Sequence, residues 1–313
     1  MRIGAANKWV SKMNKEWCVY TGNWYAASDM TNEHVIALSI GGHDSFTIRT
    51  SRSGNDRANQ TLDEKVKGLP LIASFRGHYQ FRGHRDNRPL VRWPSKLGDL
   101  NVNLDLSDEA IRVESFRSKG QHAINFRRAA GEADTFSSTF SLDLNLLLRF
   151  GCRLALGSAY FLFGDTFRNY GYHEELRKLM NSPAAVQDLR FRLANKKGPG
   201  FWAVSCPESS LTLGPLGPLW KALLSQQDRH CFFTLHTVAE IVLGISLFGG
   251  LFRWYFNIAN DTDRFPIGGE FELGSATEIV YCPHEFRRSD LRSYLARFQR
   301  ALRRHPGSVK IRY

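Results

Sequence analysis

The alternation of apolar and polar residues along the chain predicts both helices and strands. Residues 141–164 are strongly apolar, which is typical of a buried helix, and Gly164 is a suitable end for it. Segments between residues 100 and 140 alternate apolar and polar positions as strands do. We expect strands again at residues 230–259. The fold class is therefore predicted to be α+β.

One apolar run, Ile241–Ala259, is nearly long enough to cross a bilayer. Arg253 lies inside it, Glu240 adjoins it, and Gly249 and Gly250 break it. These residues favour two buried strands that meet at a glycine turn, rather than a membrane-spanning segment. We therefore expect no membrane association.

Two amphipathic helices are expected in the second half of the chain. Residues 173–183 form a short helix that Asn181 and Pro183 close. Residues 289–305 form another, with Ser289 as its N-cap. Its apolar residues fall on one face and its arginines lie mostly elsewhere. We favour a solvated basic face, and a helix that follows phosphates is the alternative.

The first part of the chain differs from the rest. Residues 15 to about 70 consist of short segments punctuated by glycine, which suits a small compact module closed by a helix at residues 62–69. We divide the chain into an N-terminal module with a basic extension, residues 1–95, and a larger mixed α+β domain, residues 96–313. The second domain is expected to bind nucleic acid or a partner protein. Residues 193–202 are predicted to form a loop.

The charge balance favours a polyanionic partner. Lys and Arg number 42 against 30 Asp and Glu, for a formal charge of +12. Nucleic acid is the partner expected from such an excess, because neutralised phosphates release counterions. Arginines interleaved with aromatic residues between 74 and 93 could contact phosphates and bases, with a basic linker as an equal alternative. The candidate nucleic-acid-binding residues are Arg76, Arg82, Arg85, Arg88 and Arg92.

The cysteines indicate a reducing environment. There are five, widely scattered and never in a Cys-x-x-Cys pair, so a disulfide framework is not expected. The first residues contain no apolar core of a signal peptide. A cytoplasmic location is therefore predicted.

One stretch of the N-terminal module carries a recognisable motif. It begins with "CVYTG" at residues 18–22, continues with "TNEHVIALSIGGHDSFTI" at 31–48 and ends with "SRSGNDRAN" at 51–59. These residues resemble the HNH endonuclease family, whose catalytic unit is the ββα-metal fold. The resemblance covers residues 15–70, about a fifth of the chain.

The resemblance implies a role for each motif residue. His34 would be the general base that takes a proton from water, since histidine exchanges protons near neutral pH. Glu33 and Asn55 would hold Mg²⁺ or Mn²⁺, which stabilises charge on phosphate oxygens. Asp44 or Ser45 would fix the loop that carries the base. Nearby residues with weaker claims are His43, Asp56, Asn59 and Asp63.

Two departures from the family pattern affect these expectations. Ala37 stands where proline is usual. Two Cys-x-x-Cys pairs often hold a structural zinc in the family, but here they are replaced by Cys18 with Thr21 and by Ser51 with Gly54. One thiolate of four remains, so no structural zinc is expected. Local packing must hold the module instead, through Trp17, Tyr20, Val35, Ile36, Leu38, Phe46 and Ile48.

The resemblance implies a metal-dependent endonuclease, with DNA favoured over RNA as substrate. Such an enzyme fits a bacterial restriction or phage-defence effector. One geometric condition applies: adjacent strand residues point to opposite faces, so Glu33 and His34 share a site only where the strand bends or twists. Two alternatives remain: a non-catalytic nucleic-acid-binding protein, and a regulated subunit of a larger defence complex.

Overall fold

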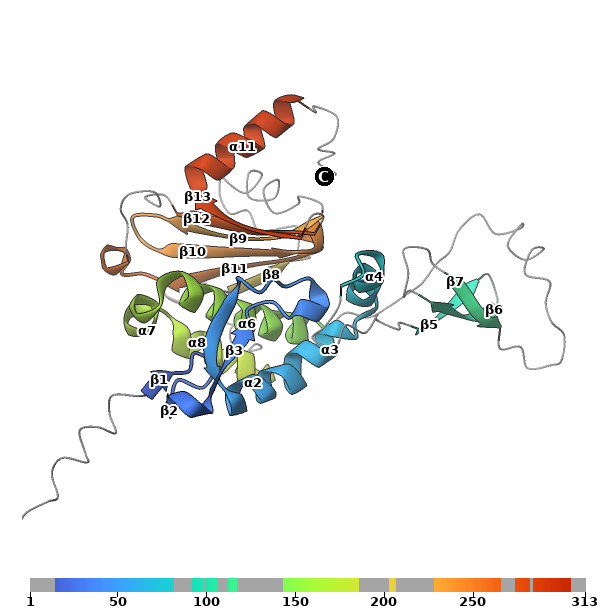
Figure 1. The fold of residues 1–313 in the computed structure, drawn as a ribbon, viewed down its shortest axis with the longest axis horizontal. Coiled ribbons are helices and arrows are strands. Elements are labelled where there is room, and N and C mark those ends of the chain that lie inside the picture. The colour runs from blue at the N-terminus through green and yellow to red at the C-terminus, as the bar shows by residue number, and fades with distance from the viewer. Residues whose placement is uncertain are drawn as a thin grey trace, which may run out of the picture.

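The structure, a computed structural model, describes residues 15–81, 92–97, 100–105, 112–116, 143–185, 203–206, 228–265, 274–281 and 284–304. These residues form both helices and antiparallel sheets, which confirms the predicted α+β class. The central sheet lies between one C-terminal helix on one side and a group of helices on the other (Figure 1).

A six-stranded antiparallel sheet is the centre of the molecule. Its strand order is β13-β12-β9-β10-β11-β8. The predicted glycine turn joins β10 to β11, where Gly249 and Gly250 adopt φ angles of 64° and 92° that other residues rarely adopt. The strands are β8 (Ala203–Cys206), β9 (Arg229–His236), β10 (Ile241–Leu247), β11 (Phe252–Ala259), β12 (Ser275–Val280) and β13 (Glu285–Asp290).

Helix α6 (Leu144–Phe163) packs along one face of this sheet and confirms the predicted buried helix. The Asp143 carboxylate caps its first turn and Gly164 ends it. The Trp254 indole N–H donates to the Leu147 carbonyl at 3.0 Å, which ties the helix to β11. Among the described helices it alone is long and apolar enough to cross a membrane. However, 72% of its apolar window is buried, as in the core helix of a soluble protein.

Two shorter helices follow α6 on the same side of the sheet. They are α7 (Asp165–Tyr170) and α8 (His173–Asn181), and α8 confirms the amphipathic helix predicted there. Helix α11 (Leu291–Arg304) covers the opposite face, where Leu291 and Tyr294 are buried. The prediction of Ser289 as its N-cap is wrong. The Ser293 N–H donates to the Asp290 carboxylate at 2.7 Å, because Asp290 is the residue directly before the first turn.

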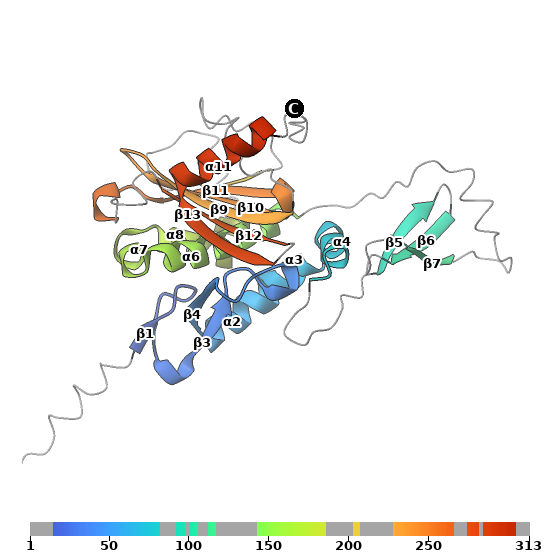
Figure 2. The ribbon, with the colours of Figure 1, turned by 45° about the horizontal axis from the view of Figure 1, so that its top comes forward.

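The N-terminal residues form a unit that packs against α6 (Figure 2). Two strands pair at its start, and a second hairpin then leads directly into a helix. That helix continues through a π-helical segment, so the short helix predicted at residues 62–69 is the end of a longer one. The elements are β1 (Lys15–Trp17), β2 (Trp24–Ala26), β3 (Met30–His34), β4 (Thr47–Ser51), α2 (Arg52–Ala58), η3 (Asn59–Asp63), α3 (Glu64–Lys67) and α4 (Pro70–His78).

A further antiparallel sheet has three strands in the order β5-β6-β7. It confirms strands between residues 100 and 140. Pro94 lies in β5, an edge strand, where a missing N–H is tolerated. The loop predicted at 193–202 lies outside the described residues. The strands are β5 (Arg92–Leu97), β6 (Leu100–Asp105) and β7 (Arg112–Phe116).

The N-terminal unit and the central sheet share one hydrophobic core. The Phe46 ring packs edge-on against Phe161 of α6 and Phe232 of β9, with ring centroids 4.8 and 5.1 Å apart. Of the residues expected to hold the module, all are buried except Leu38, which is partly exposed. Apolar packing therefore crosses the predicted boundary at residue 95, which itself falls within β5.

Candidate functional site

The predicted base, His34, is the last residue of β3, and two glycines shape the loop that joins it to β4. Gly41 adopts a φ of 89°, in the left-handed region. A Cβ at Gly42 would lie 1.9 Å from the Ile36 carbonyl oxygen, so no other residue fits there. The Val35 N–H donates to the Phe46 carbonyl and closes the loop. Gly41 and Gly42 thus form a tight turn in this loop.

His34 and Asp44 form a hydrogen-bonded pair across this loop. The His34 Nε2 lies 2.9 Å from the Asp44 Oδ1. The histidine side chain is 12% exposed and the aspartate side chain 86% exposed, so the pair lies at the surface with its histidine recessed. A carboxylate at one ring nitrogen fixes the tautomer and places the lone pair on the other nitrogen. This is the geometry of an oriented base.

Two further histidines adjoin the pair. The ring centroids of His43 and His284 lie 4.9 Å apart. The Ser45 N–H donates to the His43 Nδ1 at 3.1 Å, so Ser45 orients this second ring. Burial and the neighbouring His284 lower the pKa of His43, against an opposite effect of Asp44. His284 precedes β13, far along the chain, and no local pattern in the sequence links it to the motif.

Arg153 of helix α6 binds Glu33 inside the protein. Its Nη2 lies 2.5 Å from the Glu33 Oε1 and 3.0 Å from the Asp63 Oδ2. The same guanidinium donates to the His34 carbonyl at 3.2 Å and to the Val35 carbonyl. Arg153 is fully buried. The Glu33 and His34 side chains therefore bind different partners, and these contacts do not bring them to one metal.

Asn55 lies in the first turns of α2, and its Oδ1 is buried without a hydrogen-bond partner among the described residues. An unpaired buried oxygen suits a hard metal ion. The Glu33 carboxylate does not, because an always-charged guanidinium already binds it. In the described part of the chain, no three His, Cys, Asp or Glu side chains gather as a metal-binding group. The predicted ligand pair thus does not fit Mg²⁺ or Mn²⁺ in this arrangement.

The four positions that the resemblance compares with zinc ligands of the HNH family lie close together. The Ser51 hydroxyl donates to the Cys18 Sγ at 3.3 Å and accepts from the Gly54 N–H at 3.1 Å. A Cβ at Gly54 would lie 3.0 Å from the Thr21 Cγ2 and 3.1 Å from the Cys18 Sγ. The resemblance to the family requires these four positions to lie close together, because four ligands of one zinc ion surround it. The absence of a bound zinc stays a prediction.

The predicted nucleic-acid-binding arginines are only partly described. The Arg76 Nε donates to the Ser39 carbonyl at 2.6 Å, and burial lowers the pKa of Arg76. This side chain therefore fastens α4 to the motif loop. For Arg92 only the backbone position in β5 is described. The remaining three, which lie outside the described residues, are Arg82, Arg85 and Arg88.

The site can thus be summarised as a surface histidine cluster beside a buried ion-pair cluster. The first contains His34, Asp44, His43 and His284, and the second contains Glu33, Asp63 and Arg153. No known family model matches the chain, and neither does any curated protein or solved structure. The resemblance to HNH endonucleases therefore rests on the motif residues alone and stays a prediction.

Proposed function

We propose that the protein hydrolyses phosphodiester bonds of nucleic acid, with DNA favoured over RNA, and that His34 is the general base. The hydrogen bond between His34 and Asp44, 2.9 Å long, carries this proposal. It lies on a glycine-shaped loop between two strands that lead into a helix, in the order expected of an HNH-like nuclease. The four positions compared with zinc ligands of that family lie close together, which adds independent support; they are Cys18, Thr21, Ser51 and Gly54.

The pair explains how His34 would act. With Asp44 accepting a hydrogen bond from Nε2–H, the Nδ1 lone pair takes a proton from the attacking water. The Asp44 carboxylate then stabilises the imidazolium that forms. The recessed histidine keeps its orientation while the exposed aspartate remains hydrated.

A requirement for Mg²⁺ or Mn²⁺ stays a prediction, and no step is assigned to a metal ion. The unpaired Asn55 oxygen favours a metal, while the Arg153 guanidinium on Glu33 opposes one. The cytoplasmic location, a partner protein and a role in restriction or phage defence also stay predictions. A phage plaque assay that compares the wild type with His34→Ala tests the defence role.

The second candidate function is non-catalytic binding of nucleic acid. The ion pair between Glu33 and the buried Arg153 favours this candidate, because a carboxylate bound to a guanidinium serves the structure and is not a free metal ligand. In that case the motif would serve as a scaffold, and the basic surface would hold nucleic acid without cutting it.

A cleavage assay separates the two candidates. Full-length protein is incubated with plasmid DNA and with RNA, in EDTA and with Mg²⁺ or Mn²⁺. His34→Ala should lose at least about 100-fold in rate, and Asp44→Asn should lose a comparable amount because it misdirects the tautomer. The matched control is His78→Ala, an exposed histidine on α4 outside the cluster. Undiminished cleavage by His34→Ala would refute the assignment of the base. Binding without cleavage under every metal condition would favour the second candidate.

A further inference from the structure

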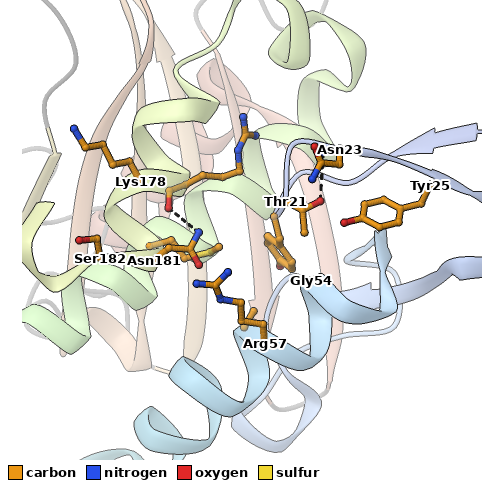
Figure 3. Close-up of a pocket in the computed structure, with 12 residues that line it drawn as sticks. Thr21, Asn23, Tyr25, Gly54, Arg57, Lys178, Asn181 and Ser182 are labelled. Atoms are coloured by element: carbon orange, nitrogen blue, oxygen red, sulfur yellow. Dashed lines mark hydrogen bonds between the residues drawn. The ribbon is translucent and has the colours of Figure 1, made fainter.

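A cavity of about 580 Å³ opens between α2 and α8. Its walls come from the β1–β2 segment, from α2 and from α8, so two parts distant in sequence build it (Figure 3). None of the residues of the histidine cluster lines it. A cavity of this size lies within the range of small-ligand sites, roughly 300–1,000 Å³.

The cavity is strongly cationic. Arg57, Arg177 and Lys178 line it, and neither Asp nor Glu does. Within the described part of the chain, none of these three cations forms an ion pair with a carboxylate. Burial lowers the pKa of Arg149, and the nearby positive charge of Arg57 lowers it further. Glu174 and Glu175 favour the charge of Arg177 only from a longer distance, so the cations that line the cavity have no carboxylate in direct contact among the described residues.

Arg177 is held in place rather than free to leave the cavity. It donates to the Val19 carbonyl at 3.2 Å and lies 2.7 Å from the His173 Nδ1. Its guanidinium also stacks over the Trp17 ring at 5.5 Å. A Cβ at Gly22 would lie 2.9 Å from this guanidinium, so glycine makes room for it. Burial lowers the pKa of Arg177, and an anion bound beside it would offset that cost.

Neutral polar groups complete the lining. Hydroxyls and amides of Thr21, Asn23, Asn181 and Ser182 can share hydrogen bonds with ligand oxygens. Tyr25 brings an aromatic ring and a hydroxyl to the same wall (Figure 3). Guanidinium groups match phosphate oxygens in geometry, and an aromatic face can stack on a base. Phosphate and a nucleobase are therefore the chemistry that this lining recognises.

We propose that the cavity binds a phosphate-bearing ligand of mononucleotide size, with Arg57 and Arg177 as phosphate contacts. This site is separate from the histidine cluster and does not depend on the proposed nuclease activity. Arg57 belongs to the helix that carries Asn55, so a ligand here would contact a helix of the motif.

Isothermal titration of the full-length protein tests the proposal, with AMP, adenosine, inorganic phosphate and a short oligonucleotide as probes. We expect AMP to bind, adenosine to bind at least tenfold more weakly, and phosphate to compete with AMP. Arg57→Gln should weaken AMP binding at least tenfold. Arg52→Gln should not, because Arg52 is an exposed arginine on the same helix outside the cavity.

Thermal melting of each variant confirms that it is folded. Equal AMP affinities of Arg57→Gln and Arg52→Gln would overturn the proposal, as would no AMP binding at millimolar concentration. Binding of the oligonucleotide alone would assign the positive charge to a nucleic-acid chain and would also overturn it. His34→Ala should bind AMP as the wild type does, so failure of the nuclease proposal leaves this test unaffected.

Discussion

At the scale of single residues, the Arg153 side chain joins parts of the chain that are distant in sequence. A guanidinium that is always charged lies fully buried between the carboxylates of Glu33 and Asp63. Burial raises the pKa of Asp63 to about 6, although Arg153 acts in the opposite direction. Buried ion pairs add little net stability, but removing one partner leaves an uncompensated charge. Arg153 therefore connects helix α6 to Glu33 near the end of β3 and to Asp63 at the end of η3.

We predict that Arg153→Met lowers the free energy of unfolding by about 3–5 kcal/mol, because two buried carboxylates lose their cation. Urea unfolding measures the change. Adding Glu33→Gln and Asp63→Asn to Arg153→Met should restore part of the stability, since no buried charge then remains unpaired. The control Arg52→Met, at an exposed site, should change stability by no more than about 0.5 kcal/mol. A loss no larger than that control would contradict the role given to Arg153.

The sequence could identify the local part of the site but not its distant part. His34, Asp44 and the glycine pair lie within one short stretch, so their order and spacing could be compared with a known motif. Arg153 lies 120 residues from Glu33, and in the sequence it is one arginine in an apolar helix. Its partners follow from how α6 packs on the motif, which no local pattern encodes.

At the scale of elements, His230 joins β9 to the motif loop. Its Nε2–H donates to the Ile40 carbonyl at 2.8 Å. Its Nδ1 accepts from the Tyr281 hydroxyl at 3.0 Å and from the Phe248 N–H at 3.3 Å. Burial lowers the pKa of His230 to about 3. The histidine is thus a neutral connection between the sheet and the loop that carries the predicted base.

This neutral histidine should make the fold sensitive to acid. Between the ordinary histidine pKa near 6.5 and the folded value of about 3, the unfolded chain binds a proton that the folded chain does not. Stability contributed by neutral His230 is therefore present above pH 6.5 and falls as the pH drops. We expect a loss of about 2–3 kcal/mol between pH 6.5 and 4.5. Chemical unfolding at several pH values in this range measures the free energy of unfolding of the wild type and of His230→Gln. This free energy should depend less steeply on pH in the variant than in the wild type. Identical slopes would contradict this explanation.

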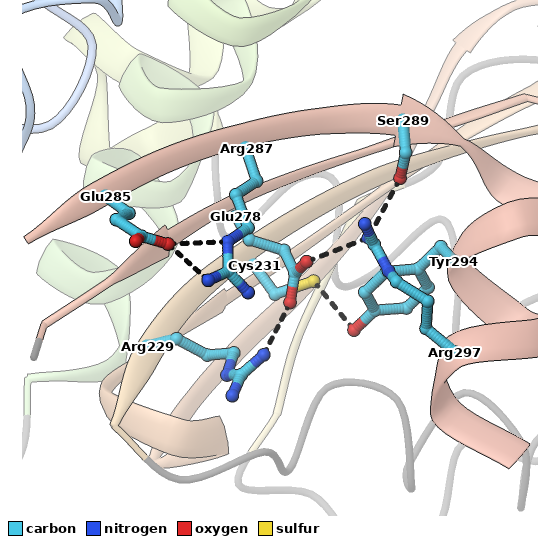
Figure 4. Close-up of polar contacts among 8 residues, drawn as sticks. All are labelled: Arg229, Cys231, Glu278, Glu285, Arg287, Ser289, Tyr294 and Arg297. Atoms are coloured by element: carbon cyan, nitrogen blue, oxygen red, sulfur yellow. Dashed lines mark hydrogen bonds and ion pairs between the residues drawn. The ribbon is translucent and has the colours of Figure 1, made fainter. Parts of the chain in front are cut away.

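Helix α11 is held to the sheet by a buried carboxylate. The Glu278 Oε1 of β12 lies 2.7 Å from the Arg229 Nη1, and its Oε2 lies 3.2 Å from the Arg297 Nη2 of α11 (Figure 4). The Tyr294 hydroxyl of α11 lies 3.5 Å from the Cys231 Sγ. Glu278 is almost fully buried. The pair with Arg297 therefore connects the helix to the strand beneath it.

We predict that Glu278→Gln increases amide hydrogen exchange in α11 at least several-fold, because the Arg297 contact loses its charge. The matched control is Glu285→Gln. It removes an exposed ion pair with Arg287 on the neighbouring strand and should leave exchange in α11 unchanged. Equal exchange in the two variants would show that apolar packing alone holds the helix.

The elements themselves could be predicted well where one pattern dominates. The apolar residues of α6, the amphipathic α8 and the glycine turn between β10 and β11 all follow from local sequence. The cap of α11 was misplaced by one residue, because serine and aspartate are both good caps and stand side by side. The pairing of β9 with both β10 and β12 could not be predicted, since the strand order depends on long-range contacts.

At the scale of the whole molecule, the motif depends on the rest of the chain. Phe46 packs on α6 and β9, and Arg153 and His230 both bind the motif from outside it. A module of about 60 residues is only marginally stable by itself, because it buries only about 60% of the surface that its unfolded chain exposes. The α+β class was predictable, but the shared core was not, because composition does not indicate which segments pack together.

We therefore predict that a fragment of residues 1–95 does not fold alone. Its backbone amide signals should show little dispersion in an NMR spectrum, whereas the full-length protein should show a folded pattern. Addition of a separately produced fragment of residues 96–313 should restore part of the structure if both pieces remain soluble. A dispersed spectrum for residues 1–95 alone would contradict the dependence on α6 and β9.

This dependence has a consequence for how the protein is made. Ribosomes add roughly 5–20 residues per second, and N-terminal segments usually fold first. Here the motif precedes its partners Arg153 and His230 along the chain, so it is synthesised before them. It can reach its folded shape only after these partners have been made. A nascent or truncated chain that ends before His230 therefore carries the whole motif sequence without its folded shape.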